Sequence, residues 1–546
     1  MLSCPVVHAV TGSKAAVVTP DPRATQAALK VLNEGGNAMD ALLTAQAVLN
    51  VVAPQSSGIG GGASLLYYDR ATRAVLYFDG SVRSPAKLFP KMFLDKGGRP
   101  LSADAVRTSG LSVGVPGALK LLAEVQARYG SGKKNFGALL APAITFAEEG
   151  MEVSEPLGAA LKQNMSVLGT SRSFREIFFR NGLTAGAGDR IRQTDLAETL
   201  KLLKKHGPDI FYEGKIGAAV VKAAGAAPAP QSVLTAGDLK NYAIVKQDPL
   251  YVSYGEQDLF TAGPPSAGGV MLFASLNLLN ELGLSAFPGK PEAVHLLAET
   301  MKLTGGLDVA IGDPDFFDLP VGKILSKEWT GERASRVALN KAMRRSAFTR
   351  SSAGTRNTLS VSILIIDRYG NIVNYSASMG NSFGSGILVP GYGFFLNDLM
   401  LDFDTDEAAM KDPDFPNIPG PRQRPRNFFT PLFVFREGRP VMALSASDGR
   451  ESAKTVLNLF VQRADFNVPC AGILEVSRVF DRDGVMVMEE ELYNQDTWRV
   501  QLELWGHKPL SQAFLGEGQM VCFDEENGKL VAESDLRGDL YGAAAV

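Results

Sequence analysis

The 546-residue sequence contains few of the residues from which metal centres and disulfide frameworks are built. Its three cysteines, Cys4, Cys470 and Cys522, are far apart and odd in number, and its four histidines are equally scattered. This spacing predicts neither a disulfide framework nor a cysteine-based metal site, and it does not favour a histidine-rich zinc site. We therefore expect chemistry that needs no metal and no cofactor.

The sequence also lacks an excess of charge and any long apolar run. Its 58 acidic and 55 basic residues give a net charge of -3, which offers no basis for binding nucleic acid or an acidic polymer. No stretch is long and apolar enough to span a membrane, and no secretion signal is visible. We expect a cytoplasmic protein, or an extracellular or periplasmic one if a signal is missing.

What the sequence does contain is a helix-rich region followed by a sheet-rich region. "ATQAALKVLNEGG" and, after the capping residue Asn37, "AMDALLTAQAVLNVV" predict two helices. Residues 339–357 are polar and basic, which predicts a solvated linker, and strand patterns follow it. We expect an α+β fold with a helix-rich region, 1–357, and a sheet-rich region, 358–546, that form one intertwined unit.

The strand that follows the linker begins with hydroxyl side chains. Thr358, Ser360 and Ser362 alternate with apolar residues in "TLSVSILIID", so they share one face of the strand. Hydroxyls are ordinary on the wet side of a sheet. A threonine can also be a nucleophile without histidine or cysteine, if the bond before it is cut and its own α-amino group acts as the base.

Other motifs carry less weight. "GNSFG" (380–384) fits a nucleophile elbow on Ser382, with His507 as the partner, but no helical pattern follows it as an elbow requires. "GSGKKN" lacks the first glycine and the final hydroxyl of a phosphate-binding loop. In "SSGIGGG" we expect the glycines to permit close backbone packing or a turn with positive φ.

Several longer motifs occur together and in order, among them "ATQAALKVLNEGGNAMDA", "PQSSGIGGGA", "PPSAGG", "GFFLNDLMLDF" and "SDLRGD". In these the chain resembles, nearly end to end, the γ-glutamyltranspeptidase family of N-terminal-nucleophile hydrolases. The resemblance implies a four-layered αββα sandwich whose precursor cuts itself before a threonine into a large and a small chain that stay associated. It also implies attack on a γ-glutamyl or related acyl amide, with water or an amine as acceptor.

The resemblance assigns roles to several positions. It places the nucleophile at Thr358, or at Ser360 if the following hairpin sets the alignment. Ser378 stands where the family has a threonine that hydrogen-bonds the nucleophile. Asp402 matches the aspartate that holds the α-ammonium group of the substrate, and Asn397 belongs to the same motif. We expect these residues to form the catalytic and substrate-binding site.

Other positions depart from the family pattern. The arginine that binds the substrate α-carboxylate falls on Ser81, although Arg83 is two residues on. The two serines that assist it fall on Asn427 and Phe428, and the Gly-Gly oxyanion hole falls on Asp448 and Gly449. The resemblance thus implies an amidohydrolase or acyltransferase with altered acyl specificity, and a non-catalytic binding protein remains the alternative.

The sequence predicts self-cleavage between Asn357 and Thr358, where the linker gives way to the strand. Denaturing electrophoresis and N-terminal sequencing of the purified protein should show a second chain that starts at Thr358. A start at Ser360 would move the nucleophile by two residues. A chain that stays intact after long incubation would favour the binding-protein alternative.

Overall fold

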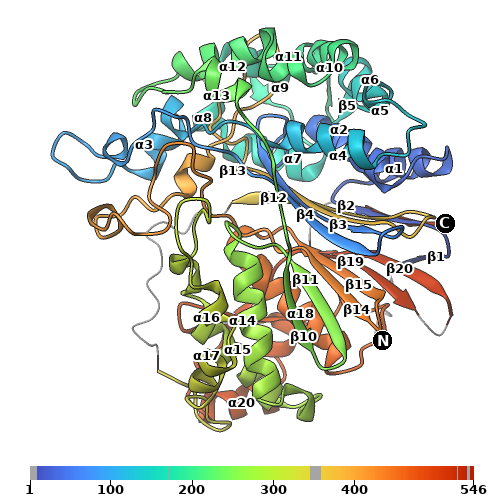
Figure 1. Cartoon of the computed structure of the whole chain (residues 1–546), viewed down its shortest axis with the longest axis vertical. Helices are drawn as coiled ribbons and strands as arrows, with labels where there is room; N and C mark the ends of the chain where they lie inside the picture. Colours follow the sequence, from blue (N-terminus) through green and yellow to red (C-terminus); the bar gives the residue numbers. More distant parts are fainter. Residues whose placement is uncertain (1–8, 170, 345–357, 525–526, 538–541) are drawn as a thin grey trace.

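The computed structural model describes residues 9–169, 171–344, 358–524, 527–537 and 542–546. Most of the expected linker, 345–357, including Asn357, lies outside these residues, as does Cys4. Within the described residues, a pair of seven-stranded antiparallel sheets stacks between two layers of helices (Figure 1). The expected four-layered αββα sandwich is confirmed.

The strands of the two sheets come from along the whole chain. The first sheet has the spatial order β21 (Gly542–Ala545), β2 (Ala16–Thr19), β12 (Leu359–Ile366), β13 (Ile372–Gly380), β3 (Gly62–Asp69), β4 (Ala74–Gly80), β9 (Val245–Gln247). The second has the order β1 (Val10–Gly12), β20 (Lys529–Ser534), β19 (Gly518–Asp524), β15 (Arg439–Ala446), β14 (Leu432–Arg436), β11 (Gln257–Thr261), β10 (Leu250–Tyr254). Three smaller sheets comprise β16 (Val479–Arg482), β17 (Val485–Glu489) and β18 (Leu510–Gln512); β5 (Met151–Glu152) and β8 (Arg190–Ile191); and β6 (Phe179–Arg180) and β7 (Leu183–Thr184).

Helices cover the outer face of each sheet (Figure 1). The layer over the first sheet includes α1 (Pro22–Asn33), α2 (Ala38–Val52), α4 (Ala118–Tyr129), α6 (Ala141–Glu149), α7 (Glu155–Gln163), α9 (Arg172–Phe178), α10 (Thr194–His206) and α12 (Lys215–Gly225). Its shorter helices are α3 (Ala103–Arg107), α5 (Phe136–Leu139), α8 (Met165–Leu168), α11 (Asp209–Tyr212) and α13 (Ala236–Lys240). The layer over the second sheet has α14 (Ala267–Glu281), α15 (Pro291–Thr304), α16 (Val321–Ile324), α17 (Lys327–Ala334), α18 (Ser452–Ala464), α19 (Glu490–Tyr493) and α20 (Asp496–Leu504).

Each large sheet mixes strands from before and after residue 358. In the first sheet β12 and β13 lie between β2 and β3, and in the second β14 lies beside β11. The expectation that strands gather after residue 357 is therefore only partly right, because the early strands β2, β3 and β4 complete the same sheet. The regions 1–357 and 358–546 share both sheets.

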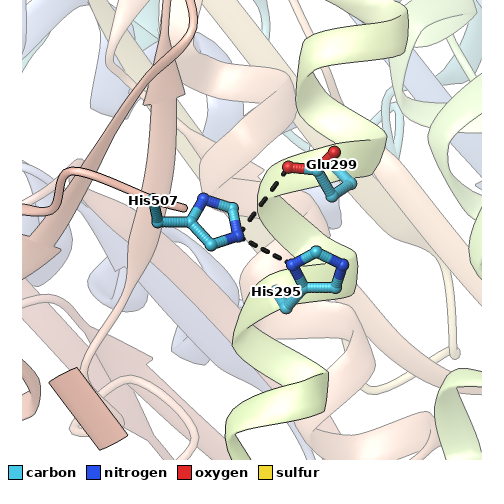
Figure 2. Close-up of side chains that lie close together, drawn as sticks. All are labelled: His295, Glu299 and His507. Carbon is cyan, nitrogen blue, oxygen red and sulfur yellow. Dashed lines mark hydrogen bonds and ion pairs between the residues drawn. The ribbon is translucent and has the colours of Figure 1, made fainter. Parts of the chain in front are cut away.

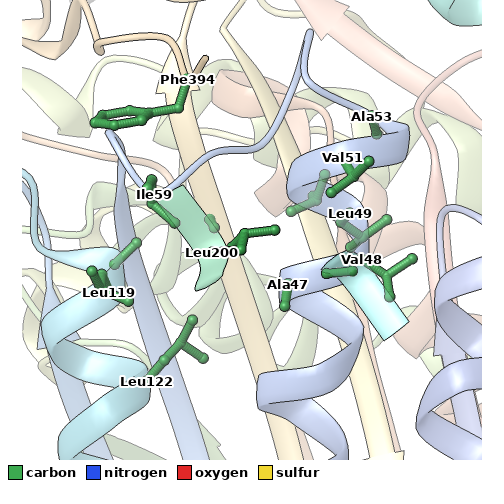
Figure 3. Close-up of a cluster of buried hydrophobic side chains, with 14 of the residues drawn as sticks. Ala47, Val48, Leu49, Val51, Ala53, Ile59, Leu119, Leu122, Leu200 and Phe394 are labelled. Atoms are coloured by element: carbon green, nitrogen blue, oxygen red, sulfur yellow. The ribbon is translucent and has the colours of Figure 1, made fainter. Parts of the chain in front are cut away.

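Helix α2 is the centre of the core above the first sheet. All of its side chains are buried, and Asn37 caps it together with Asp40 in a reciprocal capping box. Its apolar residues pack with those of α4 and α10, including Leu119, Leu122 and Leu200 (Figure 3). Apolar residues on most sides of a helix are typical of a buried position. The predicted Asn37 cap and the helix end before Pro54 are confirmed.

Strand β12 has two different faces, as its alternating sequence predicts. Ile363 and its alternate neighbours pack against the helices, whereas Leu364 packs between the two sheets. Toward the start of β12 this inter-sheet space becomes polar. The Ser362 hydroxyl donates to the carbonyl of Ala446 at 3.1 Å, and the Asn374 amide donates to that of Leu444 at 2.7 Å. These bonds tie the sheets together beside the strand end at Thr358.

Two expectations from composition meet different outcomes. The structure joins Cys470, after α18, to Cys522 on β19 by a disulfide, so the expectation of no disulfide is wrong. Folding brings together residues that are 52 positions apart in sequence. Among the described residues, no helix combines the length and apolar character needed to cross a bilayer.

Candidate active site

A pocket opens where the start of β12 meets three loop segments. The segments carry the short helices η5 (Leu399–Asp402) and η7 (Gly449–Glu451) and the stretch 425–429. Its lining comprises Gly62, Ser81, Val82, Thr358, Ser360, Ser378, Leu399, Asp402, Pro425, Arg426, Asn427, Phe428, Phe429, Gly449 and Ser452. Most of the residues predicted from the sequence therefore line one pocket, including both candidate nucleophiles.

Thr358 stands against Gly449. The backbone of Gly449 has φ +58, and a Cβ built there would collide with the Oγ1 atom of Thr358 and would lie 2.7 Å from its carbonyl oxygen. Only glycine adopts this conformation at such close range without strain. The geometry places the Gly449 backbone, which the resemblance assigns to the oxyanion hole, directly beside the Thr358 hydroxyl.

The Ser378 hydroxyl binds the residue that follows Thr358 and not Thr358 itself. Its hydroxyl donates to the carbonyl of Leu359 at 2.5 Å and accepts the N–H of Gly380 at 2.9 Å. Leu359 pairs with Gly380 and Ser360 with Ser378, so Met379 is an extra residue on β13. Such a bulge locally increases the twist of a strand and redirects its end. The Ser378 hydroxyl thus anchors the residue that follows the candidate nucleophile.

The glycine-rich turn before β3 supports the same strand end. A Cβ on Gly61 would collide with the carbonyl of Ser378. Gly58, Gly60, Gly61 and Gly62 have no positive φ, so close packing, rather than an unusual backbone conformation, explains these glycines. Of the two expectations for "SSGIGGG", the close approach of backbones is the correct one.

Asp448 turns its carboxylate away from Thr358. One carboxylate oxygen accepts the N–H of Glu517 at 2.5 Å and the other lies 2.5 Å from the Thr455 hydroxyl. Burial raises the pKa of Asp448 to about 7, against the opposing effects of Thr455, Arg478 and the Glu517 N–H. The carboxylate is therefore not directed at the position where an oxyanion would develop, and Asp448 does not line the pocket.

The pocket lining also combines Asp402, which the resemblance predicted, with Arg426, which sequence reasoning missed. Arg426 is buried and its guanidinium binds the Asp404 carboxylate at 2.9 Å. Burial would lower its pKa, but Asp404, Asp308 and Asp402 outweigh burial and raise it. The residue lies inside the "RPRNFFTP" segment, where the family resemblance pointed only to Asn427 and its neighbour. Its neutralising partners can be identified only in the folded chain.

Only some of the positions that we expected to bind the substrate α-carboxylate lie in the pocket. Asn427 donates its amide to the Ser81 hydroxyl at 3.1 Å, so these two pocket residues bind each other. Arg83 does not line the pocket. Its guanidinium lies 3.8 Å from Asp315 and donates to the carbonyl of Arg422 at 3.5 Å. The structure therefore brings Ser81 and Asn427 to the site, and directs Arg83 elsewhere.

Asn397 and Ser382 also lie outside the pocket lining. The side-chain amide of Asn397 donates to the carbonyls of Gly60 and Gly114, at 2.7 and 2.9 Å, and its oxygen accepts two backbone N–H groups. It braces the loops behind the pocket. Ser382 precedes no helix, and the ring of His507 contacts His295 instead. The elbow interpretation has no assembled triad.

Asp448 should make stability depend on pH. Its folded pKa is raised, so between about pH 4 and pH 7 the folded protein retains a proton that the unfolded chain has released, and stability falls as pH rises through this window. The slope contributed by one such group is at most about 1.4 kcal/mol per pH unit. Asp448→Asn should show a shallower fall in urea unfolding across this range. Equal slopes in the two proteins would contradict the expectation.

Comparisons with known proteins agree with this geometry. The family model described as gamma-glutamyltranspeptidase matches residues 24–545. The chain is 31% identical to the glutathione hydrolase proenzyme of Bacillus subtilis (strain 168), over 97% of this chain and 92% of that protein. It is 29% identical to the acylase ACY 1 proenzyme of Pseudomonas sp. (strain V22), over 97% and 93%.

A solved cephalosporin acylase from Bacillus halodurans has the same fold, with a TM-score of 0.84, 24% identity, and coverage of 100% of this chain and 99% of that one. The gamma-glutamyltranspeptidase of Helicobacter pylori matches with a TM-score of 0.57 and 28% identity, over 65% of this chain and all of that one. The relatives are enzymes made as proenzymes, and the non-catalytic alternative is not favoured. The chain belongs to the gamma-glutamyltranspeptidase family of self-processing hydrolases.

Proposed function

We propose that the protein cuts itself before Thr358 and then hydrolyses or transfers the acyl group of an amide, with Thr358 as the nucleophile. The observation that carries the proposal is the contact between the Thr358 hydroxyl and the Gly449 backbone at one end of the pocket. Thr358 also immediately precedes β12, a central strand of the first sheet. Family membership supports the reaction class, and the geometry supports the choice of residue.

The reaction proceeds in two halves. The α-amino group freed by the cut takes the proton of the Thr358 hydroxyl while Oγ1 bonds to the amide carbon. The oxyanion that develops lies toward the Gly449 backbone N–H. Collapse of this intermediate breaks the C–N bond, the leaving amine takes the proton, and an ester to Thr358 remains. Water or a second amine then attacks the ester, releases the acid or new amide, and restores the hydroxyl.

Ser360 is the weaker choice for nucleophile. It lines the same pocket, but it is paired with Ser378 within the sheet. The Gly449 backbone approaches Thr358 within the distance at which a Cβ would collide with the hydroxyl. A nucleophile also needs a neighbouring base, and a cut before Thr358 provides an α-amine only on that residue.

The residues that line the pocket favour an acyl group other than the γ-glutamyl group of the standard family substrates. Asp402 is present for an ammonium group, and the remaining wall includes Leu399, Phe428 and Phe429. Arg426 is already neutralised by the carboxylates of Asp404 and Asp308. We infer an acyl donor with an apolar portion, in keeping with a relative named as an acylase.

The disulfide in the structure supports a choice of compartment. The disulfide between Cys470 and Cys522 is of a kind that persists in oxidising surroundings. We therefore favour the extracellular or periplasmic alternative over the cytoplasmic expectation. Thiol counting on the freshly isolated, unreduced protein tests this choice, because a cytoplasmic protein would show both thiols free.

Thr358→Ala should abolish both the cut and amide hydrolysis, because the base and the nucleophile are lost together. Ser382→Ala should do neither, since its hydroxyl is buried outside the pocket. Electrophoresis and hydrolysis of γ-glutamyl and simple acyl anilides measure both activities. An active Thr358→Ala protein, or an inactive Ser382→Ala protein that still folds, would refute the assignment.

We expect the enzyme to prefer a substrate that carries an α-carboxylate only weakly over one that lacks it. A charge-assisted hydrogen bond contributes about 1.5–3 kcal/mol, so an intact clamp would give a preference of roughly tenfold to a hundredfold. The measurement is kcat/KM for a γ-glutamyl amide and for its analogue without the α-carboxylate. We expect less than about a tenfold difference, unchanged in Arg83→Ala. A strong preference that vanishes in Arg83→Ala would show that Arg83 turns into the pocket, and one that persists would identify another carboxylate-binding group.

A further inference from the structure

A buried group of two histidines and a glutamate lies outside the pocket lining and has no role in the proposed reaction (Figure 2). His295 and Glu299 are four residues apart on α15, so they share one face of that helix. His507 follows α20 and points its ring at both. One ligand atom from each of the three lies within 4.8 Å of the others, and all three side chains are buried.

The hydrogen bonds of His295 determine which of its nitrogens is available. Its Nε2 lies 2.8 Å from the carbonyl oxygen of Ala338, which can only accept, so Nε2 carries a proton. Its Nδ1 lies 2.7 Å from Nε2 of His507. Burial lowers the pKa of both rings. In the neutral ring, the lone pair of His295 Nδ1 therefore faces His507.

This is the arrangement in which proteins present histidine to a metal ion. Metal-ligating imidazoles are neutral, and their second nitrogen donates to a carbonyl or carboxylate that orients the ring. Two histidines and one glutamate form a zinc ligand set that leaves a fourth position open. Zn–N bonds of 2.0–2.1 Å in tetrahedral geometry place two nitrogens about 3.3 Å apart. The two rings need to separate only slightly from their 2.7 Å contact.

Other buried charged side chains lie near this group of three residues. The Lys302 ammonium lies 2.6 Å from Oε1 of Glu299 and competes for that oxygen. Asp481 is buried as well, and among the residues that the structure describes its Oδ2 has no hydrogen-bond partner. Burial raises its pKa to about 6, an effect that the Gly484 N–H, Lys302 and Lys454 diminish and Glu299 reinforces.

We propose that His295 Nδ1, His507 Nε2 and a carboxylate oxygen of Glu299 bind one Zn²⁺ ion. On binding, His507 moves its proton from Nε2 to Nδ1, so that both nitrogen lone pairs converge on the metal, and Lys302 yields its place on Glu299. His295 and Glu299 precede Thr358 and His507 follows it. The ion therefore cross-links the two chains that the proposed cut produces, although its binding does not depend on that cut.

The test uses the full-length, tag-free protein, stripped with a chelator and then dialysed against Zn²⁺ or Co²⁺. We expect one zinc per chain by elemental analysis, the visible absorption of tetrahedral Co²⁺, and a melting temperature that rises with zinc. His507→Gln retains an N–H donor toward His295 but is a poor zinc ligand. It should weaken zinc affinity by more than about a hundredfold, beyond the 10–100-fold typical of outer-shell changes.

Matched variants identify the site and guard against misfolding. His295→Gln should lose the metal as His507→Gln does, whereas His206→Gln, altered at the exposed end of α10, should bind it normally. Lys302→Met should bind zinc more tightly, because the competing ammonium is gone. Absence of stoichiometric zinc in the wild-type protein, or equal zinc binding by wild type and folded His507→Gln, would overturn the proposal.

Discussion

The pairing of β12 with β13 fixes the point on which the site depends. β12 lies between β2 and β13 in the middle of the first sheet. β13 pairs with it from Leu359 to Ile366, whereas β2 pairs only with Leu364–Ile366, so the start of β12 is held by β13. Thr358 immediately precedes this strand, and the Ser378 hydroxyl on β13 holds the carbonyl of Leu359. A nucleophile placed at the end of a central strand inherits the rigidity of the whole sheet, which is what preorganised catalysis requires.

A buried cluster of charged residues also supports the wall of the pocket. Arg424 binds Asp79 at 2.7 Å and lies within hydrogen-bond distance of Asp313. Burial alone would lower its pKa, but Asp79 and Asp313 outweigh burial and keep it raised. Asp79 in turn accepts the N–H of Ser81 in the pocket. Buried ion pairs contribute little net stability, yet they are costly to break singly, so this cluster holds distant segments in one arrangement.

Local patterns predicted what depends on neighbours in sequence. The cap at Asn37 and the alternating faces of β12 follow from periodicity and capping chemistry, and both appear as expected. Family resemblance supplied the layered fold and the set of residues that meet at the pocket. The disulfide between Cys470 and Cys522, and the pairing of His295 with His507, join residues far apart in sequence. No spacing rule could have revealed these contacts.

Side-chain direction was the other limit of sequence reasoning. Arg83 lies two residues from a pocket position, which suggested a substitute clamp, but its guanidinium is drawn to Asp315. Asn397 belongs to the motif of Asp402, but four backbone hydrogen bonds occupy its side-chain amide. Both outcomes depend on partners that tertiary packing brings close. A position in a motif therefore predicts where a residue lies, but not which groups its side chain binds.

The interleaving of early and late strands in both sheets has a consequence for folding history. While the chain is continuous, its two regions are tethered and meet at a high effective concentration. Once the proposed cut before Thr358 is made, neither fragment can complete a sheet alone, and reassembly from the denatured state becomes a bimolecular encounter between incomplete sheets. The exposed strand edges of such fragments are prone to aggregate. The native state would then persist through slow unfolding, because the cut has removed the route by which it formed.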